Sequence, residues 1–170
     1  LGTQMKATGE VMSIGRTMEE SLLKAMRSLE TGVCHIYHKK FDDWTNDRLL
    51  EYIAEPTDDR LYAIAQLIRG GVDLVLIYNR TKIDMFFLEK FKNIVEFERV
   101  VEAAPMDIEV LREAKRMGFS DKFIGQLWGV SQHDMYLLRE KNGIFPVYKM
   151  IDTCASEFSS YVPYFYSTYE

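Results

Sequence analysis

The chain has 170 residues, of which 47% are hydrophobic and 28% are charged, and its formal net charge is −5. That length suits one domain, and the hydrophobic content is high enough to bury a core, which excludes intrinsic disorder. The acidic balance argues against a surface that neutralises nucleic-acid phosphates, and no apolar stretch is long enough to span a bilayer.

The first expected helix follows an extended segment, residues 1–16. Thr17 and Glu20 form the pattern T-x-x-E, in which the hydroxyl and the carboxylate each accept a backbone N–H at a helix start. Leucine and methionine then recur at helical spacing, and Gly32 supplies a stop. The segment 33–45 has no clean period, so we expect a loop there.

Two short helices and one ambiguous run are expected next. A helix capped by Thr45 or Asn46 runs to about residue 54, and another follows the break at Pro56 and ends at Gly70–Gly71. The apolar run Val72–Tyr78 would also suit a strand. Its position among helices favours a short helix instead.

The longest helix is expected to open at Thr81 and to close at Pro105, with Asp84 in its first turn, where a negative charge suits the helix dipole. Its apolar residues cover more than half of the helix surface. Such a helix either lies at the centre of the core or forms part of an interface. The candidate oligomer or packing surface therefore consists of Phe86, Phe87, Phe91, Ile94 and Phe97.

Three more short helices are expected at about 107–117, 121–128 and 132–141, because a glycine follows each of them. Pro146 then forces an extended segment, and the last twenty residues hold so many aromatic side chains that they need a surface to pack on. The sequence thus predicts a mainly α fold: an irregular bundle of short helices with extended N- and C-terminal segments.

Residues 120–141 have the pattern of a helix-turn-helix, with a turn at Gly129 and a cap at Ser131. A recognition helix presents Arg, Lys, Asn or Gln to base edges and gathers cations for phosphates. Here the cations are balanced by an equal number of acidic side chains, so a packing motif is favoured. A small helical nucleic-acid-binding module is the alternative function. The charged residues are Lys122, Arg139 and Lys141 against Asp121, Asp134 and Glu140.

No set of residues has the pattern of a catalytic or metal site. Cys34, His35 and His38 lie close together, but a tetrahedral zinc site needs four ligands, and His133 and Cys154 are distant in sequence. A polar loop is the better interpretation, and the two cysteines suit a reducing cytoplasm better than a disulfide. Because no Gly-rich phosphate loop occurs either, we expect no catalytic, cofactor-binding or metal-binding residue. An independent enzyme with its own pocket is a third, less favoured hypothesis.

Both ends of the chain resemble the large subunit of carbamoyl phosphate synthetases. Thr3–Glu30 is similar to the segment that closes the first ATP-grasp domain of that family, through the sequence TQMKATGEVMSIGRTMEESLLKAMRSLE. In it, Ala7 replaces a common Ser and Met18 a common Phe. Pro146–Glu170 is similar to the segment that introduces the second synthetic half, through PVYKMIDTCASEFSSYVPYFYSTYE. Shorter matches lie at Thr81–Leu88, Ala114–Asp121 and Leu138–Ile144, whereas residues 31–80 match weakly.

The resemblance implies that the chain is one part of a larger, cytoplasmic ligase. That family makes carbamoyl phosphate for arginine or pyrimidine biosynthesis from bicarbonate, glutamine-derived ammonia and two ATP. Its sites for ATP, with Mg²⁺ or Mn²⁺, and for K⁺ belong to the ATP-grasp halves, upstream of Leu1 and downstream of Glu170. The chain itself is therefore expected to be inactive.

The same resemblance implies a division of the chain and a set of partners. Residues 1–30 would end an ATP-grasp (carboxyphosphate) domain, 31–150 would form a helical oligomerisation or connecting domain, and 151–170 would link to the second synthetic half. The implied partners are the flanking ATP-grasp halves, the glutaminase small subunit and further copies of the chain in a homo-oligomer. Neither nucleic acid nor membrane is implied.

Overall fold

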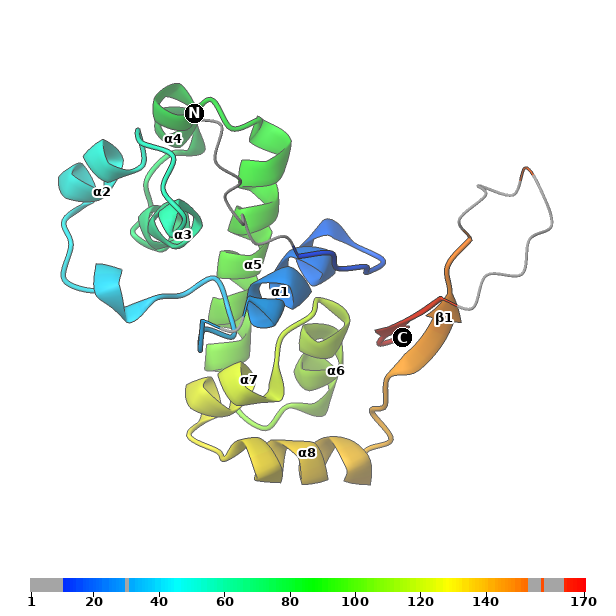
Figure 1. The fold of residues 1–170 in the computed structure, drawn as a ribbon. Coiled ribbons are helices and arrows are strands. Elements are labelled where there is room, and N and C mark those ends of the chain that lie inside the picture. Colours follow the sequence, from blue (N-terminus) through cyan, green and yellow to red (C-terminus); the bar gives the residue numbers. More distant parts are fainter. Residues whose placement is uncertain (1–10, 30, 153–156, 158–163) are drawn as a thin grey trace.

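Helices dominate the computed structural model, which describes residues 11–29, 31–152, 157 and 164–170. Within these residues it contains eight α-helices, one short 3-10 helix and a two-stranded antiparallel sheet (Figure 1). The expected mainly α fold is confirmed. The elements are α1 (Met18–Ser28), η1 (Lys39–Phe41), α2 (Asn46–Tyr52), α3 (Arg60–Arg69), α4 (Leu74–Thr81), α5 (Met85–Ala103), α6 (Ile108–Arg116), α7 (Asp121–Trp128), α8 (Gln132–Lys141), β1 (Val147–Met150) and β2 (Phe165–Thr168).

The cap of α1 differs in one respect from the expected reciprocal pair. The Thr17 hydroxyl accepts the backbone N–H of Glu20 at 3.1 Å, as the pattern predicts. The Glu20 carboxylate, however, accepts the N–H of Arg16 at 2.7 Å, one residue before the cap. The first interaction satisfies an N–H group that a helix start leaves without an intrahelical partner, and the second holds the residue that precedes the cap. Side-chain caps also begin α2, α7 and α8, at Thr45, Ser120 and Ser131.

The ambiguous run Val72–Tyr78 is helical from Leu74 onward, so the expected short helix is confirmed. The carboxylate of Asp73 caps α4 by accepting the N–H of Val75 at 2.8 Å. An aspartate at this position favours a helix over a strand, because it satisfies a free N–H that only a helix start exposes.

The expected start of the longest helix at Thr81 is wrong, since Thr81 is the last residue of α4. Lys82 adopts the left-handed conformation with φ 57°, which ends α4. Asp84 then caps α5 by accepting the N–H of Phe86 at 2.8 Å, rather than lying inside the first turn. The two apolar helices are therefore separated by the short link Lys82–Asp84 and lie against each other.

Helix α5 is the centre of the molecule, in contact with α1, α3, α4, α6 and α7 (Figure 1). Its buried residues join those of the other helices in a single hydrophobic cluster, which includes Leu23 and Met26 of α1. The segment 33–45 contains η1 and otherwise lacks regular structure, but it is not merely polar, because it buries Ile36 and Phe41 in the same cluster. The division at residues 30 and 150 stays a prediction.

Phe91 should be a major source of stability, because it is only 5% exposed on the core side of α5. We expect Phe91→Ala to lower the free energy of unfolding by about 3–5 kcal/mol, through lost burial and the cavity left behind. Urea denaturation measures this change. Val100→Ala, an exposed position on the same helix, is the control and should cost less than about 1 kcal/mol. A loss of that small size for Phe91→Ala would contradict a core position.

The end of the chain folds back as a hairpin beside the helices (Figure 1). Strand β1 directly follows Pro146, as expected for an extended exit, and pairs with β2 so that Tyr148 lies opposite Ser167. This pairing was not predicted. Among the terminal aromatics that the structure describes, Tyr169 packs against the core, whereas Tyr164 and Phe165 are exposed, so the expected packing is found for only part of them. Phe158 and Tyr161 lie outside the described residues.

Candidate functional site

The structure divides the five residues of the predicted oligomer or packing surface. Phe91 and Ile94 are buried, and Phe97 is partly buried against the core. Phe86 and Phe87 are 52% and 41% exposed, and their rings meet edge to face with centroids 5.3 Å apart. Among the five, the side chains that a partner could contact directly are therefore the Phe86–Phe87 pair and the free edge of Phe97.

Helix α4 adds exposed apolar residues that the sequence reasoning did not single out. Its run Leu74–Tyr78 is wholly apolar apart from the tyrosine hydroxyl, yet within this run the structure fully buries Ile77. Val75 and Leu76 remain 53% and 51% exposed. We name the α4–α5 corner as the exposed set Val75, Leu76, Tyr78, Phe86 and Phe87. In Figure 1, α4 and the start of α5 lie at the opposite end of the molecule from α8.

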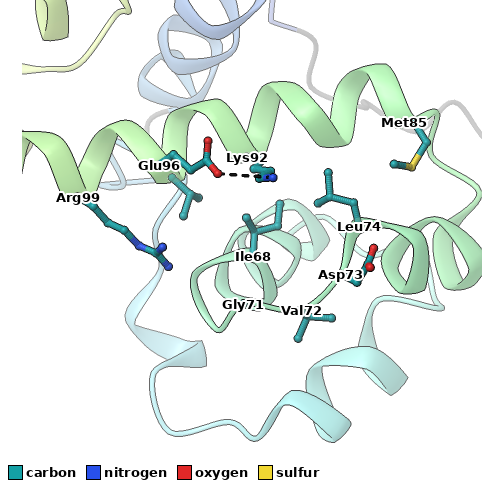
Figure 2. Close-up of a pocket in the computed structure, with 10 residues that line it drawn as sticks. Ile68, Gly71, Val72, Asp73, Leu74, Met85, Lys92, Glu96 and Arg99 are labelled. Atoms are coloured by element: carbon teal, nitrogen blue, oxygen red, sulfur yellow. Dashed lines mark ion pairs between the residues drawn. The ribbon is translucent and has the colours of Figure 1, made fainter.

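A cavity of about 510 Å³ lies between α5 and the turn that joins α3 to α4 (Figure 2). Its charged groups are already engaged. Lys92 and Glu96 form an ion pair at 3.5 Å along α5, and Arg99 donates to the carbonyl of Arg69 at 3.0 Å. The remaining lining is largely apolar, including Ile68, Val72, Leu74, Met85 and Val95. The cavity thus offers an apolar floor with a charged rim rather than a nucleophile beside a base.

A first buried polar cluster links α3, α5 and the segment before η1. The Glu98 carboxylate accepts two hydrogen bonds from the Arg69 guanidinium, both at 2.7 Å, and one from His35 Nε2 at 2.9 Å. Burial alone would raise the pKa of Glu98, but the hydrogen bonds from Arg69 and His35 outweigh it and hold that pKa below its ordinary value. Glu98 is thus ionised, and His35 carries its proton on Nε2.

His35 is a core residue, which corrects the interpretation of Cys34, His35 and His38 as a polar loop. Its ring stacks on Phe123 with centroids 3.6 Å apart. Burial lowers the pKa of His35 and outweighs the opposing effect of Glu98. Among the described residues no group of His, Cys, Asp and Glu could hold a metal ion. Cys34 is a free thiol, and Cys154 lies outside the described residues.

The low pKa of His35 predicts a loss of stability in mild acid. Below pH 6.5 the unfolded chain takes up a proton at this histidine while the folded chain does not, so the free energy of unfolding falls as the pH falls. The slope from one such proton is at most about 1.4 kcal/mol per pH unit. Urea denaturation between pH 7.5 and 5 measures it. In His35→Gln the slope should be shallower; an unchanged slope would assign it to other groups.

A second buried cluster joins α6, α7 and α8. Asp121 accepts two near-parallel bonds from Arg139, from Nε and Nη2, at 2.9 and 2.8 Å, and a third from Lys115 Nζ at 2.9 Å. Lys115 also donates to the carbonyl of Phe119, and Arg139 to that of Ile144. Burial lowers the pKa of Lys115 to about 8, although Asp121 favours the charged form.

The Asp121 cluster tests whether the helix-turn-helix pattern of residues 120–141 could bind nucleic acid. α7 and α8 do pack as a pair. Arg139, however, is buried against Asp121 and cannot reach a nucleic acid, which leaves Lys122 and Lys141 as the exposed cations of the segment. The geometry therefore gives no support to the nucleic-acid-binding alternative and fits a packing motif.

Comparison with protein families identifies the family to which this helical chain belongs. No helix within the described ranges is long and apolar enough to cross a membrane. Residues 10–143, well over half of the chain, match the model of a family described as "Carbamoyl-phosphate synthetase large chain, oligomerisation domain". That match agrees with the mainly helical body and its exposed apolar corner. The chain belongs to the family of oligomerisation domains of the carbamoyl-phosphate synthetase large chain.

Proposed function

We propose that this domain joins copies of a carbamoyl-phosphate synthetase large chain through the α4–α5 corner. The observation that carries the proposal is the set of exposed apolar residues around the link Lys82–Asp84, in a domain of this family. Val75, Leu76, Phe86 and Phe87 are each more than two-fifths exposed. Leaving such side chains in water forgoes about 25 cal/mol for every Å² of apolar surface that a partner would cover.

A second copy is the occupant that this corner fits best. Symmetric dimers are the commonest assemblies of identical chains, and each copy would present the same apolar surface to the other. Aromatic residues are enriched at the centres of interfaces, where the Phe86–Phe87 pair would lie. A stable contact should bury about 1,000 Å² or more in total.

The hairpin has a different role in the proposal. Tyr148, Met150, Tyr164 and Phe165 are exposed on it, at a distance from the α4–α5 corner (Figure 1). Residues 146–170 resemble the segment that leads into the second synthetic half. We therefore assign these side chains to contacts with the flanking ATP-grasp halves of the same chain, and the helical body to the connection between them.

The wider setting is part of the same proposal. The parent enzyme would be cytoplasmic, would work with a glutaminase small subunit, and would make carbamoyl phosphate for arginine or pyrimidine biosynthesis. ATP, Mg²⁺ or Mn²⁺, and K⁺ would bind in the ATP-grasp halves. Within each of the clusters around Glu98 and Asp121, the carboxylate is paired with the cations beside it, so the part of these clusters is to hold the helices together.

Sedimentation over a concentration series tests the role of the α4–α5 corner. We expect the unmodified chain to associate at tens of micromolar and the double variant Phe86→Glu, Phe87→Glu to sediment as a monomer. The control is Phe165→Glu, at a phenylalanine on the hairpin that is more exposed than Phe86 and Phe87, and this variant should associate normally. Circular dichroism confirms that each variant is folded.

Two outcomes would contradict this assignment. Dissociation by Phe165→Glu alone would move the interface to the hairpin. If both the chain and the complete large subunit stay monomeric, the oligomerisation role fails and only the connecting role is left.

A further inference from the structure

A second cavity, of about 280 Å³, lies between the hairpin and the helices. One wall is a face of the hairpin, where Tyr148 and its partner Ser167 point to the same side because opposite residues of paired strands share a face. The facing wall is basic: Lys24 and Arg27 come from α1, and Lys115 comes from α6. This cavity is separate from the α4–α5 corner.

The two carboxylates that line the cavity are already neutralised. Glu20 pairs with Lys24 at 2.7 Å. Asp121 pairs with Lys115 at 2.9 Å and with Arg139 at 2.8 Å, so that one carboxylate serves two cations. Both carboxylates attract Arg27 at longer range but are bonded to other cations, and the group as a whole carries an excess of positive charge.

Arg27 has few polar partners within the described residues. Its guanidinium is partly buried, and within the described residues it makes one hydrogen bond, from Nη1 to the carbonyl of Gly118 at 2.5 Å, and no ion pair. Burial lowers the pKa of Arg27, which means that the cation is held where it is poorly solvated. Buried charges in proteins are normally paired, and a guanidinium offers five N–H donors in a fork that matches an oxyanion.

The start of α7 adds to the positive electrostatic potential of the cavity. Ser120, the capping residue, and Asp121, the first helical residue, both line the cavity. The amino end of this eight-residue helix therefore faces the cavity, and its dipole favours a negative charge there.

We infer that this cavity binds a small oxyanion, a phosphate or carboxylate group, through the Arg27 guanidinium with Lys115 beside it. The group can come from a free anion or from an acidic side chain elsewhere in the synthetase. In both cases the oxyanion supplies the missing partner of Arg27 and ties α1, the α6–α7 turn and the hairpin together.

Titration with inorganic phosphate at constant ionic strength tests the inference. Isothermal calorimetry measures the binding of phosphate to the chain and, separately, to the complete large subunit. We expect saturable binding that Arg27→Gln weakens about tenfold or more, equivalent to about 1.4 kcal/mol. Arg80→Gln, an exposed arginine of α4, is the control and should bind as the unmodified chain does. If Arg27→Gln does not fold, Arg27→Lys keeps the charge without the fork and should still weaken binding severalfold.

The two proteins distinguish the sources of the oxyanion. Binding to both the chain and the complete subunit identifies a free anion. Binding to the chain alone shows that a carboxylate of the remaining subunit fills the cavity. The inference is overturned if neither protein binds phosphate saturably, if chloride competes equally well at the same concentration, or if both Arg27 variants bind as the unmodified chain does.

Discussion

Replacing Asp121 by alanine is expected to lower the free energy of unfolding by about 3–5 kcal/mol, because it leaves two buried cations without their carboxylate. Arg139 and Lys115 are both buried, and Asp121 is the carboxylate partner of each. Lys115 can respond by losing its proton, since its pKa is already lowered to about 8. Arg139 cannot lose its proton, so most of the lost free energy of unfolding comes from leaving its guanidinium buried without a carboxylate.

Urea denaturation of Asp121→Ala at pH 7 measures this effect. Asp134→Ala is the control, because Asp134 also lies in the first turn of a helix but is exposed, and its loss should cost at most about 1 kcal/mol. A triple variant that also carries Lys115→Met and Arg139→Met should recover much of the stability, since apolar replacement of a whole buried ion cluster is often neutral. Equal stability of Asp121→Ala and Asp134→Ala would contradict the buried-charge argument.

The helices could be predicted because their signals are local. Ser120 and Ser131 mark the starts of α7 and α8, because each hydroxyl accepts a backbone N–H only three residues further along the chain. The misplaced start at Thr81 has the same origin. Thr81 and Asp84 are both capping residue types, and the sequence does not show that Lys82 takes the left-handed conformation that ends α4.

The buried ion clusters could not be predicted by the same means, because their partners are distant along the chain. Glu98 meets His35 across 63 positions and Arg69 across 29. One signal was nevertheless present. Glu98 follows Ile94 by four residues and precedes Val101 by three, so it lies on the apolar side of α5. A charged residue in such a stripe indicates a buried partner.

The candidate surface was predicted only in part, because the width of an apolar stripe does not tell how much of it the core uses. Phe91 and Ile94 are buried in the hydrophobic core that α5 forms with the other helices. Phe86 and Phe87 lie in the first turn of α5, where the covering helices leave both rings partly exposed. The distinction depends on tertiary packing and not on the local pattern.

Removal of the Glu98 carboxylate should have an effect of similar size to that of Asp121. Glu98→Ala leaves the Arg69 guanidinium with the carbonyl of Ile36 and the side chain of Gln66 as its partners, and it leaves His35 Nε2 without an acceptor. We expect a loss of about 3–5 kcal/mol in the free energy of unfolding. Glu98→Gln keeps the shape and an acceptor oxygen, so it should cost less, about 1–3 kcal/mol.

Glu96 provides the matched control for this prediction, since it lies on the same helix but is exposed and pairs with Lys92 at 3.5 Å. An exposed pair of this kind contributes at most about 1 kcal/mol, so Glu96→Ala should change the urea midpoint only slightly. The pH dependence separates charge from packing. Because the pKa of Glu98 is lowered in the fold, its contribution is complete above about pH 4.5 and is lost as the pH falls through the folded pKa. The difference between the unmodified chain and Glu98→Gln should therefore shrink below pH 4, and a difference that stays constant down to pH 3 would mean that packing, not the buried charge, is what Glu98 contributes.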